Sequence, residues 1–224
     1  MLKYSENNSF YHTRQVGKMT QIPYIQEVKR KLVHLSSLWM AAALLFLPRS
    51  FCAILFGTMT VLTVLLEYAH YRKVPVLWQC YDFFFGRMLR DYGDGRFHLS
   101  GGAPVLAAAC LSAVCFAAPY SAFAMAVMLL GDTAAALVGR RFGRHRAFNG
   151  KSLEGLFAFL AVGFLVVATG CAAYGCPGAV WCGGAAGVAV ASALEFFNRE
   201  LHLDDNFTIP LAVGFGFYLG TLAA

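Results

Sequence analysis

Charged residues are scarce in this chain, and their scarcity limits what the protein can be. Only 13% of the 224 residues are Asp, Glu, Lys or Arg, whereas 58% are hydrophobic, which excludes an ordinary soluble domain. Linkers, low-complexity tracts and obvious repeats are absent, and the polar first 31 residues are not expected to be a secretory signal. The seven cysteines form no CxxC pair, so we expect most of them to act as small apolar residues.

The chain is instead dominated by long apolar runs. Seven runs of roughly 16–20 residues approach the ~20 residues that span a bilayer. They predict an all-α fold, a polytopic membrane bundle of about seven transmembrane helices. A single domain over 24–224 would follow a flexible cytosolic tail, residues 1–23. The predicted spans are 32–47, 51–66, 101–119, 122–139, 156–175, 178–197 and 207–224.

One further helix is predicted between the second and third spans. Residues 76–90 form an amphipathic pattern typical of a helix in the membrane interface. Such a helix either packs against the bundle or forms one wall of a lateral entrance for a lipid substrate. Its apolar residues recur at helical spacing: Leu77, Tyr81, Phe84, Phe85 and Met88.

The basic residues predict the orientation. Of the 18 Lys and Arg residues, 17 fall in alternate connecting segments, and Arg49 is the exception. Because basic segments stay on the cytosolic side, the N-terminus and any polar chemistry are predicted to be cytosolic. The membrane would be the bacterial inner membrane, or that of the endoplasmic reticulum in a eukaryote. Nucleic acid is not an expected partner, because the net charge of +6 comes with no recognition motif.

An aspartate inside an apolar run is the strongest indication of function. Asp132 lies seven residues before Gly139 and therefore about 10 Å along a helix from its inner end. A charge within a membrane segment is costly and marks a functional site by default. The alternative is a structural ion pair or hydrogen bond between helices.

A basic loop follows Asp132. Phosphoryl transfer needs positive charge around the phosphate oxygens, usually with Mg²⁺, so this loop is predicted either to clamp phosphates or to anchor the membrane face. It is not a Walker A loop, because His145 stands where that motif needs glycine and no strand precedes it. Its basic residues are Arg140, Arg141, Arg144, Arg146 and Lys151.

Other acids are predicted to emerge at the same face. Glu67 ends the second span, Glu195 ends the sixth and Asp205 precedes the last. Mg²⁺ favours a few carboxylates together with substrate phosphates, so these three acids and Asp132 are candidate metal ligands. The alternative is that they are solvated helix ends.

A polar motif also precedes the first span. Arg30, Lys31 and His34 follow Glu27 by three, four and seven residues, which places all four on one broad helix face. Arg30 and Lys31 are predicted to reach phosphates. His34 is either a general base or a structural hydrogen bonder.

Four motifs in this order resemble the CTP-dependent lipid kinases, the family of dolichol kinase, phytol kinase and the CTP-dependent diacylglycerol kinase. The resemblance covers most of residues 27–215. The family usually has a glutamate after an arginine before the third span, where this chain has Arg90-Asp91. The motifs are Glu27-x-x-Arg30-Lys31-x-x-His34, Gly131-Asp132 with Gly139-Arg140-x-x-Gly143, Gly150-Lys151-Ser152-x-Glu154-Gly155, and Asp204-Asp205-Asn206-Phe207-Thr208-Ile209-Pro210.

The resemblance implies transfer of the CTP γ-phosphate to the hydroxyl of a membrane lipid alcohol, with Mg²⁺ as cofactor. The alcohol would be a polyprenol or dolichol, phytol or diacylglycerol, and the products a lipid phosphate and CDP. Asp132, Lys31 and Arg30 would be catalytic. Nucleotide or phosphate contacts are implied for Gly139, Arg140, Gly143, Lys151, Ser152 and Asn206, with His34 and Glu154 as further members of the site.

Two alternatives stay open at this point. A CTP:phosphatidate cytidylyltransferase shares the Gly-Asp and Gly-Arg elements, but its family carries a C-terminal HGG…D-R-x-D signature where this chain reads DDNFTIPLAVGFGF. A membrane lipid transporter would place polar groups near the midplane of repeated, broken helices. No oligomeric state is predicted.

Overall fold

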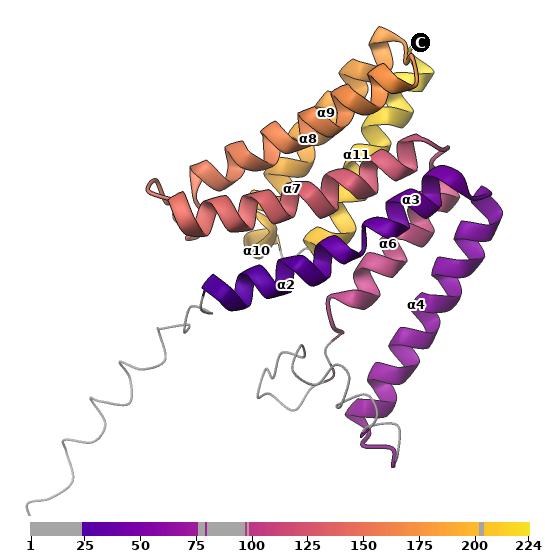
Figure 1. Ribbon diagram of the computed structural model, residues 1–224, viewed down its shortest axis with the longest axis vertical. Coiled ribbons are helices and arrows are strands. Elements are labelled where there is room, and N and C mark those ends of the chain that lie inside the picture. The colour runs from indigo at the N-terminus through magenta and orange to yellow at the C-terminus, as the bar shows by residue number, and fades with distance from the viewer. Residues whose placement is uncertain (1–23, 76–78, 80–96, 98, 202–203) are drawn as a thin grey trace, which may run out of the picture.

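The computed structural model describes residues 24–75, 79, 97, 99–201 and 204–224, and over these residues the regular structure is entirely helical (Figure 1). The all-α prediction is confirmed for this part of the chain. The helices are α2 (Tyr24–Ser36), α3 (Leu38–Phe46), α4 (Arg49–Tyr71), α6 (Gly102–Cys115), α7 (Tyr120–Phe142), α8 (Leu153–Ala173), α9 (Gly178–Phe196), α10 (Asn198–Leu201) and α11 (Asp205–Leu222).

Four described helices, α4, α7, α8 and α9, are long and apolar enough to cross a membrane. The predicted number of about seven is therefore too high by this measure. The first predicted span is divided at Ser37 into α2 and the nine-residue α3, and α6 has only 14 residues. The last predicted span corresponds to α11, whose 18 residues begin with the polar pair Asp205 and Asn206.

Proline and short polar side chains set where these helices begin. Pro48, Pro119 and Pro177 immediately precede α4, α7 and α9, where the missing N–H and the fixed φ prevent the preceding segment from continuing as helix. The Ser152 side chain caps α8 by accepting from the Gly155 N–H, and Asp204 caps α11 by accepting from the Asn206 N–H. Two of the predicted site segments are thus helix starts.

Helix α7 runs through the centre of the bundle, with α2 and α3 on one side and α8 on another (Figure 1). Small residues let other helices approach closely. In the pairing of α9 with α11, a Cβ added to Gly183 would lie 2.3 Å from the Gly216 carbonyl oxygen. The backbones of these two helices are therefore in direct contact.

The pairing of α4 with α6 is tied at both ends. The Arg49 guanidinium donates to the Ala113 carbonyl at 2.6 Å and also to the Val114 carbonyl, so it satisfies carbonyls left free at the end of α6. At the opposite end, Glu67 accepts from the Ser100 N–H at 3.0 Å. The predicted tail, 1–23, and the predicted interfacial helix, 76–90 apart from Gln79, lie outside the described residues.

Candidate functional site

A buried ion pair joins α2 to α7 at the centre of the candidate site. The Lys31 ammonium donates to Asp132 Oδ2, and the two side chains are only 2% and 10% exposed. Such a pair costs several kcal/mol of desolvation per ion, so its geometry must be supported by the surrounding packing. The sequence placed both residues in the site, and the structure brings them into contact.

His34 lies one helical turn after Lys31 and faces the same carboxylate. Its Nε2 atom is 3.4 Å from Asp132 Oδ2. That nitrogen is buried and makes no hydrogen bond within the described part of the chain. Buried nitrogens normally have a hydrogen-bond partner. Because this one has none here, it can accept a hydrogen bond from a group that enters the site.

Glu27 connects the start of α2 to the last turn of α7. Its carboxylate is 2.5 Å from Arg30 and 3.1 Å from Arg140, and the residue is only 2% exposed. Burial opposes ionisation, but the hydrogen bond and charge of Arg30, with Arg140 and Lys31, lower the pKa of Glu27 below its ordinary value. Glu27 therefore holds two of the predicted phosphate-binding arginines in place.

A second, partly buried pair joins the loop between α7 and α8 to the end of α9. Lys151 Nζ donates to Glu195 Oε1 at 2.6 Å and also to the Glu195 backbone carbonyl. Asn149 supports this contact, because its amide donates to the Phe196 carbonyl at 2.7 Å and accepts from the Lys151 N–H at 2.9 Å. Lys151 and Glu195 were both predicted for the site, but their direct pairing was not.

Asp205 brings α11 to the same region. It accepts from the Asn198 amide at 2.9 Å. Burial, with the negative charge of Asp132, raises the pKa of Asp205 to about 6, against the opposing effect of Lys31. The mutual influence of Asp205, Asp132 and Lys31 shows that α2, α7 and α11 present charges to one another. Pro210 lies four residues after Asn206 in α11. Because proline has no N–H, it cannot make the usual helical hydrogen bond to the Asn206 carbonyl.

The glycines of the predicted phosphate-binding set have an evident packing role. A Cβ on Gly143 would lie 2.2 Å from the Gly139 carbonyl oxygen, and one on Gly139 would lie 2.9 Å from Ser152 Oγ. Gly155 packs as closely, because its added Cβ would meet the Ala135 carbonyl at 2.8 Å. The missing side chains at these positions let the end of α7 pack closely against Ser152 and the start of α8. Their contact with a nucleotide stays a prediction.

Other predicted residues make contacts outside the two lysine–carboxylate pairs. Glu67 bonds to Ser100 at the end of α4 rather than to the pairs described above. Glu154 bonds to the His145 imidazole at 2.8 Å on the loop side of α8. Asn206 donates its N–H to the carboxylates of Asp204 and Asp205.

The predicted metal ligands do not form a preassembled metal site. Over the described residues, no group of three or more His, Cys, Asp or Glu side chains converges as a metal site would require. Asp132 and Glu195 hold lysines instead. A divalent ion would therefore need oxygens from a bound phosphate and the withdrawal of at least one lysine, which fits the preference of Mg²⁺ for mixed ligands.

Two residues that support the site were missed by sequence reasoning. Asn149 positions Lys151, and Asn198 positions Asp205. Each is a polar residue within a few positions of a predicted site residue, which was the available signal. The Oδ1 atom of Asn198 is also buried without a partner in the described structure, so this amide has unused capacity to accept a hydrogen bond.

Comparisons with known proteins add one relative. An uncharacterized protein of Rickettsia prowazekii (strain Madrid E) is 28% identical over 203 residues, which cover 83% of this chain and 90% of that protein. No family model matches the chain. No solved structure matches it either.

Proposed function

We propose that this protein is a CTP-dependent kinase of a membrane lipid alcohol, embedded in the membrane with its site at the cytosolic ends of the helices. In this proposal α2 with α3, α6 and α11 cross the membrane along with the four longer helices. The observation that carries the proposal is the buried contact of Lys31 with Asp132, surrounded by further lysines, arginines and acids from four helices. Charges of both signs at this depth are retained for function.

The basic side chains would bind the triphosphate. Arg30 and Arg140 are held by Glu27, and Lys151 is held by Glu195, so each is already positioned near the site. Phosphate oxygens would replace these carboxylates as partners of the cations. Charge-assisted, bidentate contacts to arginine are the strongest contacts available for this purpose. Catalysis would then consist mainly of positioning and charge stabilisation.

The acids would hold the metal. Asp132, Glu195 and Asp205 are the proposed ligands, directly or through water, whereas Glu67 lies with Ser100 and is the weakest member of the predicted set. Bound Mg²⁺ would neutralise charge on the phosphate oxygens during transfer. Lys31 and Lys151 would pass from the carboxylates to the phosphates when the nucleotide binds.

The lipid alcohol would enter from the inner leaflet with its tail in the membrane. Its hydroxyl would lie beside His34 Nε2 and Asp132 Oδ2, two acceptors 3.4 Å apart. In the reaction the hydroxyl oxygen bonds to the γ-phosphorus, the bond from that phosphorus to CDP breaks, and the proton passes to one of these acceptors. The unpartnered Nε2 favours His34 as the residue that orients the hydroxyl.

A nucleotide-by-lipid assay on the purified protein tests the proposal. The protein, in liposomes with Mg²⁺, is offered γ-labelled CTP or ATP with a polyprenol, phytol, diacylglycerol or phosphatidate. Transfer of label from CTP to one alcohol, lost in Asp132→Asn, is the expected result. Formation of a CDP-lipid and pyrophosphate from phosphatidate would identify a cytidylyltransferase instead. Lipid movement without nucleotide turnover would identify a transporter.

A further inference from the structure

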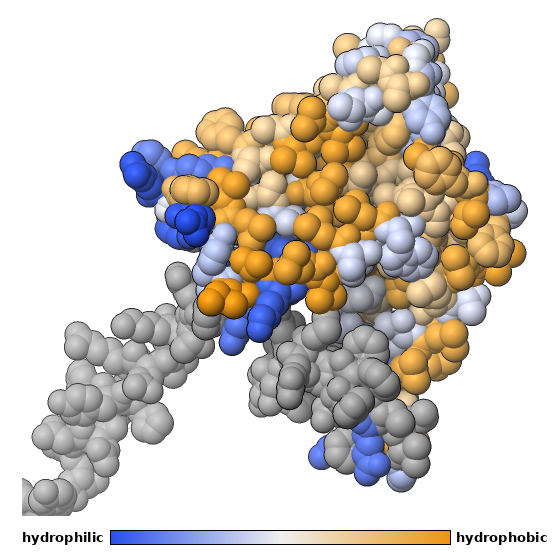
Figure 2. Space-filling model, viewed as in Figure 1, coloured by the Kyte–Doolittle hydropathy of each residue, from blue (hydrophilic) through white to orange (hydrophobic). Residues whose placement is uncertain are grey.

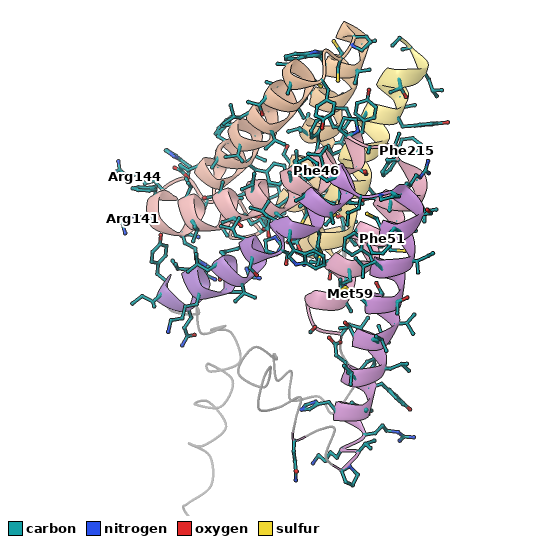
Figure 3. All side chains as sticks on the ribbon, turned by 45° about the vertical axis from the view of Figure 1, so that its right-hand side comes forward. Phe46, Phe51, Met59, Arg141, Arg144 and Phe215 are labelled. Carbon is teal, nitrogen blue, oxygen red and sulfur yellow. The ribbon has the colours of Figure 1, made fainter. Side chains whose placement is uncertain are left out.

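Four of the basic side chains in the last turn of α7 and the loop that follows it fall into two pairs with different surroundings. Arg140 and Lys151 turn inward to Glu27 and Glu195. Arg141 and Arg144 are exposed, and no carboxylate pairs with either of them within the residues that the structure describes. Both project away from the bundle at the end of α7 (Figure 3). The proposed nucleotide site therefore uses only part of the positive charge in this loop.

Exposed aromatic rings accompany these two arginines. Phe142 is 60% exposed and Phe148 is 84% exposed. The Arg141 guanidinium lies 5.7 Å from the centre of the Phe142 ring, and the Phe148 ring stacks on Phe197 with centroids 6.1 Å apart. Hydrophilic and hydrophobic surface consequently adjoin at this end of the molecule (Figure 2). Arginine beside exposed aromatic rings is typical of the membrane–water interface.

The loop is an ordered hairpin rather than an irregular connection. Ala147 donates to the Lys151 carbonyl at 2.8 Å, and Gly150, with φ at +80°, donates back to the Ala147 carbonyl at 2.9 Å. Arg146 donates to the Gly150 carbonyl at 3.0 Å, and Leu153 donates to the His145 carbonyl at 2.9 Å. Arg144 and Phe148 on this hairpin, and Arg141 and Phe142 in the last turn of α7, are therefore presented on a fixed backbone.

The position of the hairpin indicates what it contacts. It connects α7 to α8, two helices long and apolar enough to cross a bilayer, so it lies where the apolar segments end. Lipid phosphates are found at that level, with the anionic lipids concentrated in the cytosolic leaflet. A soluble phosphate would satisfy the arginines but would leave Phe142 and Phe148 exposed to water.

We propose that Arg141, Arg144, Phe142 and Phe148 form a binding site for the headgroup and upper chains of an anionic phospholipid. This hairpin site is separate from the nucleotide site and does not depend on the kinase proposal. The guanidinium groups bind the lipid phosphate by charge and fork geometry. The two aromatic rings lie among the carbonyl and upper acyl groups beside it.

Native mass spectrometry of the purified, detergent-solubilised protein tests the site. The protein is incubated with equal amounts of phosphatidylglycerol and phosphatidylcholine that carry the same acyl chains, and the retained lipids are counted. We expect the wild type to retain phosphatidylglycerol preferentially. In the Arg141→Gln/Arg144→Gln variant that preference should fall by about tenfold or more, from a loss of about fivefold per arginine.

A matched control separates the site from bulk charge. Lys29→Gln/Lys73→Gln removes the same charge from other exposed positions and should leave the lipid preference unchanged. A wild type without preference, or an equal loss in this control, would overturn the proposal. Release of the bound lipid by millimolar pyrophosphate would also overturn it, because the occupant would then be a soluble phosphate. Equal thermal unfolding midpoints would show that both variants are folded.

Discussion

Two lysine–carboxylate pairs serve the same region of the molecule, and they are built differently. Lys31 and Asp132 come from two helices packed against each other, and their side chains are 2% and 10% exposed. Lys151 comes from the hairpin between α7 and α8, and its side chain is 19% exposed against 9% for Glu195. The first pair is fixed by helix packing, whereas the position of the second depends on how the hairpin is held.

Because the two pairs are held differently, we expect them to contribute differently to ligand binding. A pair fixed between helices keeps its geometry before any ligand binds, so it can supply preorganised charge. A lysine on a hairpin can change partner at lower cost, since only local hydrogen bonds must adjust. Lys151 also contacts the Glu195 backbone carbonyl, so it keeps one acceptor if the carboxylate is lost. The helix pair should accordingly be the less tolerant of substitution.

Breaking the helix pair should have the largest effect. In Asp132→Asn, Lys31 stays buried without a charged partner, so we expect a loss of about 3–5 kcal/mol in the free energy of unfolding. Label transfer from CTP to a lipid alcohol should fall by about 1000-fold, because the preorganised charge of Asp132 is lost from the site. Thermal unfolding in detergent and the γ-label assay measure the two effects.

A double variant distinguishes charge from shape at this position. Lys31→Met/Asp132→Leu replaces both charges with apolar side chains of comparable size, and it should recover most of the lost stability while staying inactive. Recovery of activity in this variant would exclude the pair from the reaction. Unchanged stability in Asp132→Asn would show that Lys31 is not held as the structure indicates.

The sequence indicated this pair better than it indicated the roles of the surrounding glycines. A charge inside an apolar run is a local signal, so Asp132 could be found without knowing its partner 101 residues away. Close backbone approach is a property of two helices at once, so Gly139 and Gly143 were assigned to phosphates from motif alone. Their contacts with Ser152 became visible only when α7 and α8 were placed together.

The same limit applies to the predicted spans and metal ligands. Counting apolar residues cannot detect the break at Ser37, which divides the first run into α2 and α3. Nor can it place Glu67, which lies at a helix end as predicted but bonds to Ser100 there. Helix class follows from composition, whereas convergence of side chains depends on how the helices cross.

Disturbing the crossing of α7 and α8 should have the next largest effect. In Gly143→Ala the new methyl would lie 2.2 Å from the Gly139 carbonyl oxygen and 2.7 Å from Ser152 Cβ at the start of α8, so the hairpin must shift. We expect a loss of about 2–3 kcal/mol in unfolding free energy and reduced activity, because Lys151 is carried on this hairpin. Gly178→Ala is the matched control, since nothing lies within 4 Å of its new methyl. Equal losses in the two variants would contradict the close packing.

Breaking the hairpin pair should cost less than breaking the helix pair. In Glu195→Gln, Lys151 keeps the backbone carbonyl of residue 195 as an acceptor and is partly solvated. We expect a stability loss of about 2 kcal/mol and an activity loss between about 10-fold and 100-fold. A loss of activity equal to that of Asp132→Asn would mean that the two pairs act as one unit. Measuring both variants in one preparation makes the comparison direct.

Removing the charge of Asp205 should stabilise the folded protein, whereas the substitutions above destabilise it. Burial and the charge of Asp132 raise its pKa from an ordinary 3.8 to about 6, so the ionised carboxylate destabilises the folded protein at higher pH. The full difference corresponds to about 3 kcal/mol, and weaker hydrogen bonds in Asp205→Asn should offset about half of it.

Asp205→Asn should therefore be more stable than the wild type by about 1–2 kcal/mol at pH 8, while losing activity. The advantage should shrink as the pH falls below about 6, vanish at about pH 5 and reverse towards 3.8, because the wild-type carboxyl then becomes protonated and neutral while the variant keeps its weaker hydrogen bonds. Thermal unfolding of both proteins between pH 4 and pH 8 measures this difference. A variant less stable at pH 8 would show that the bonds from Asn198 and Asn206 outweigh the cost of burying the charge. A stabilised, inactive variant would identify Asp205 as a residue that the fold retains for its function.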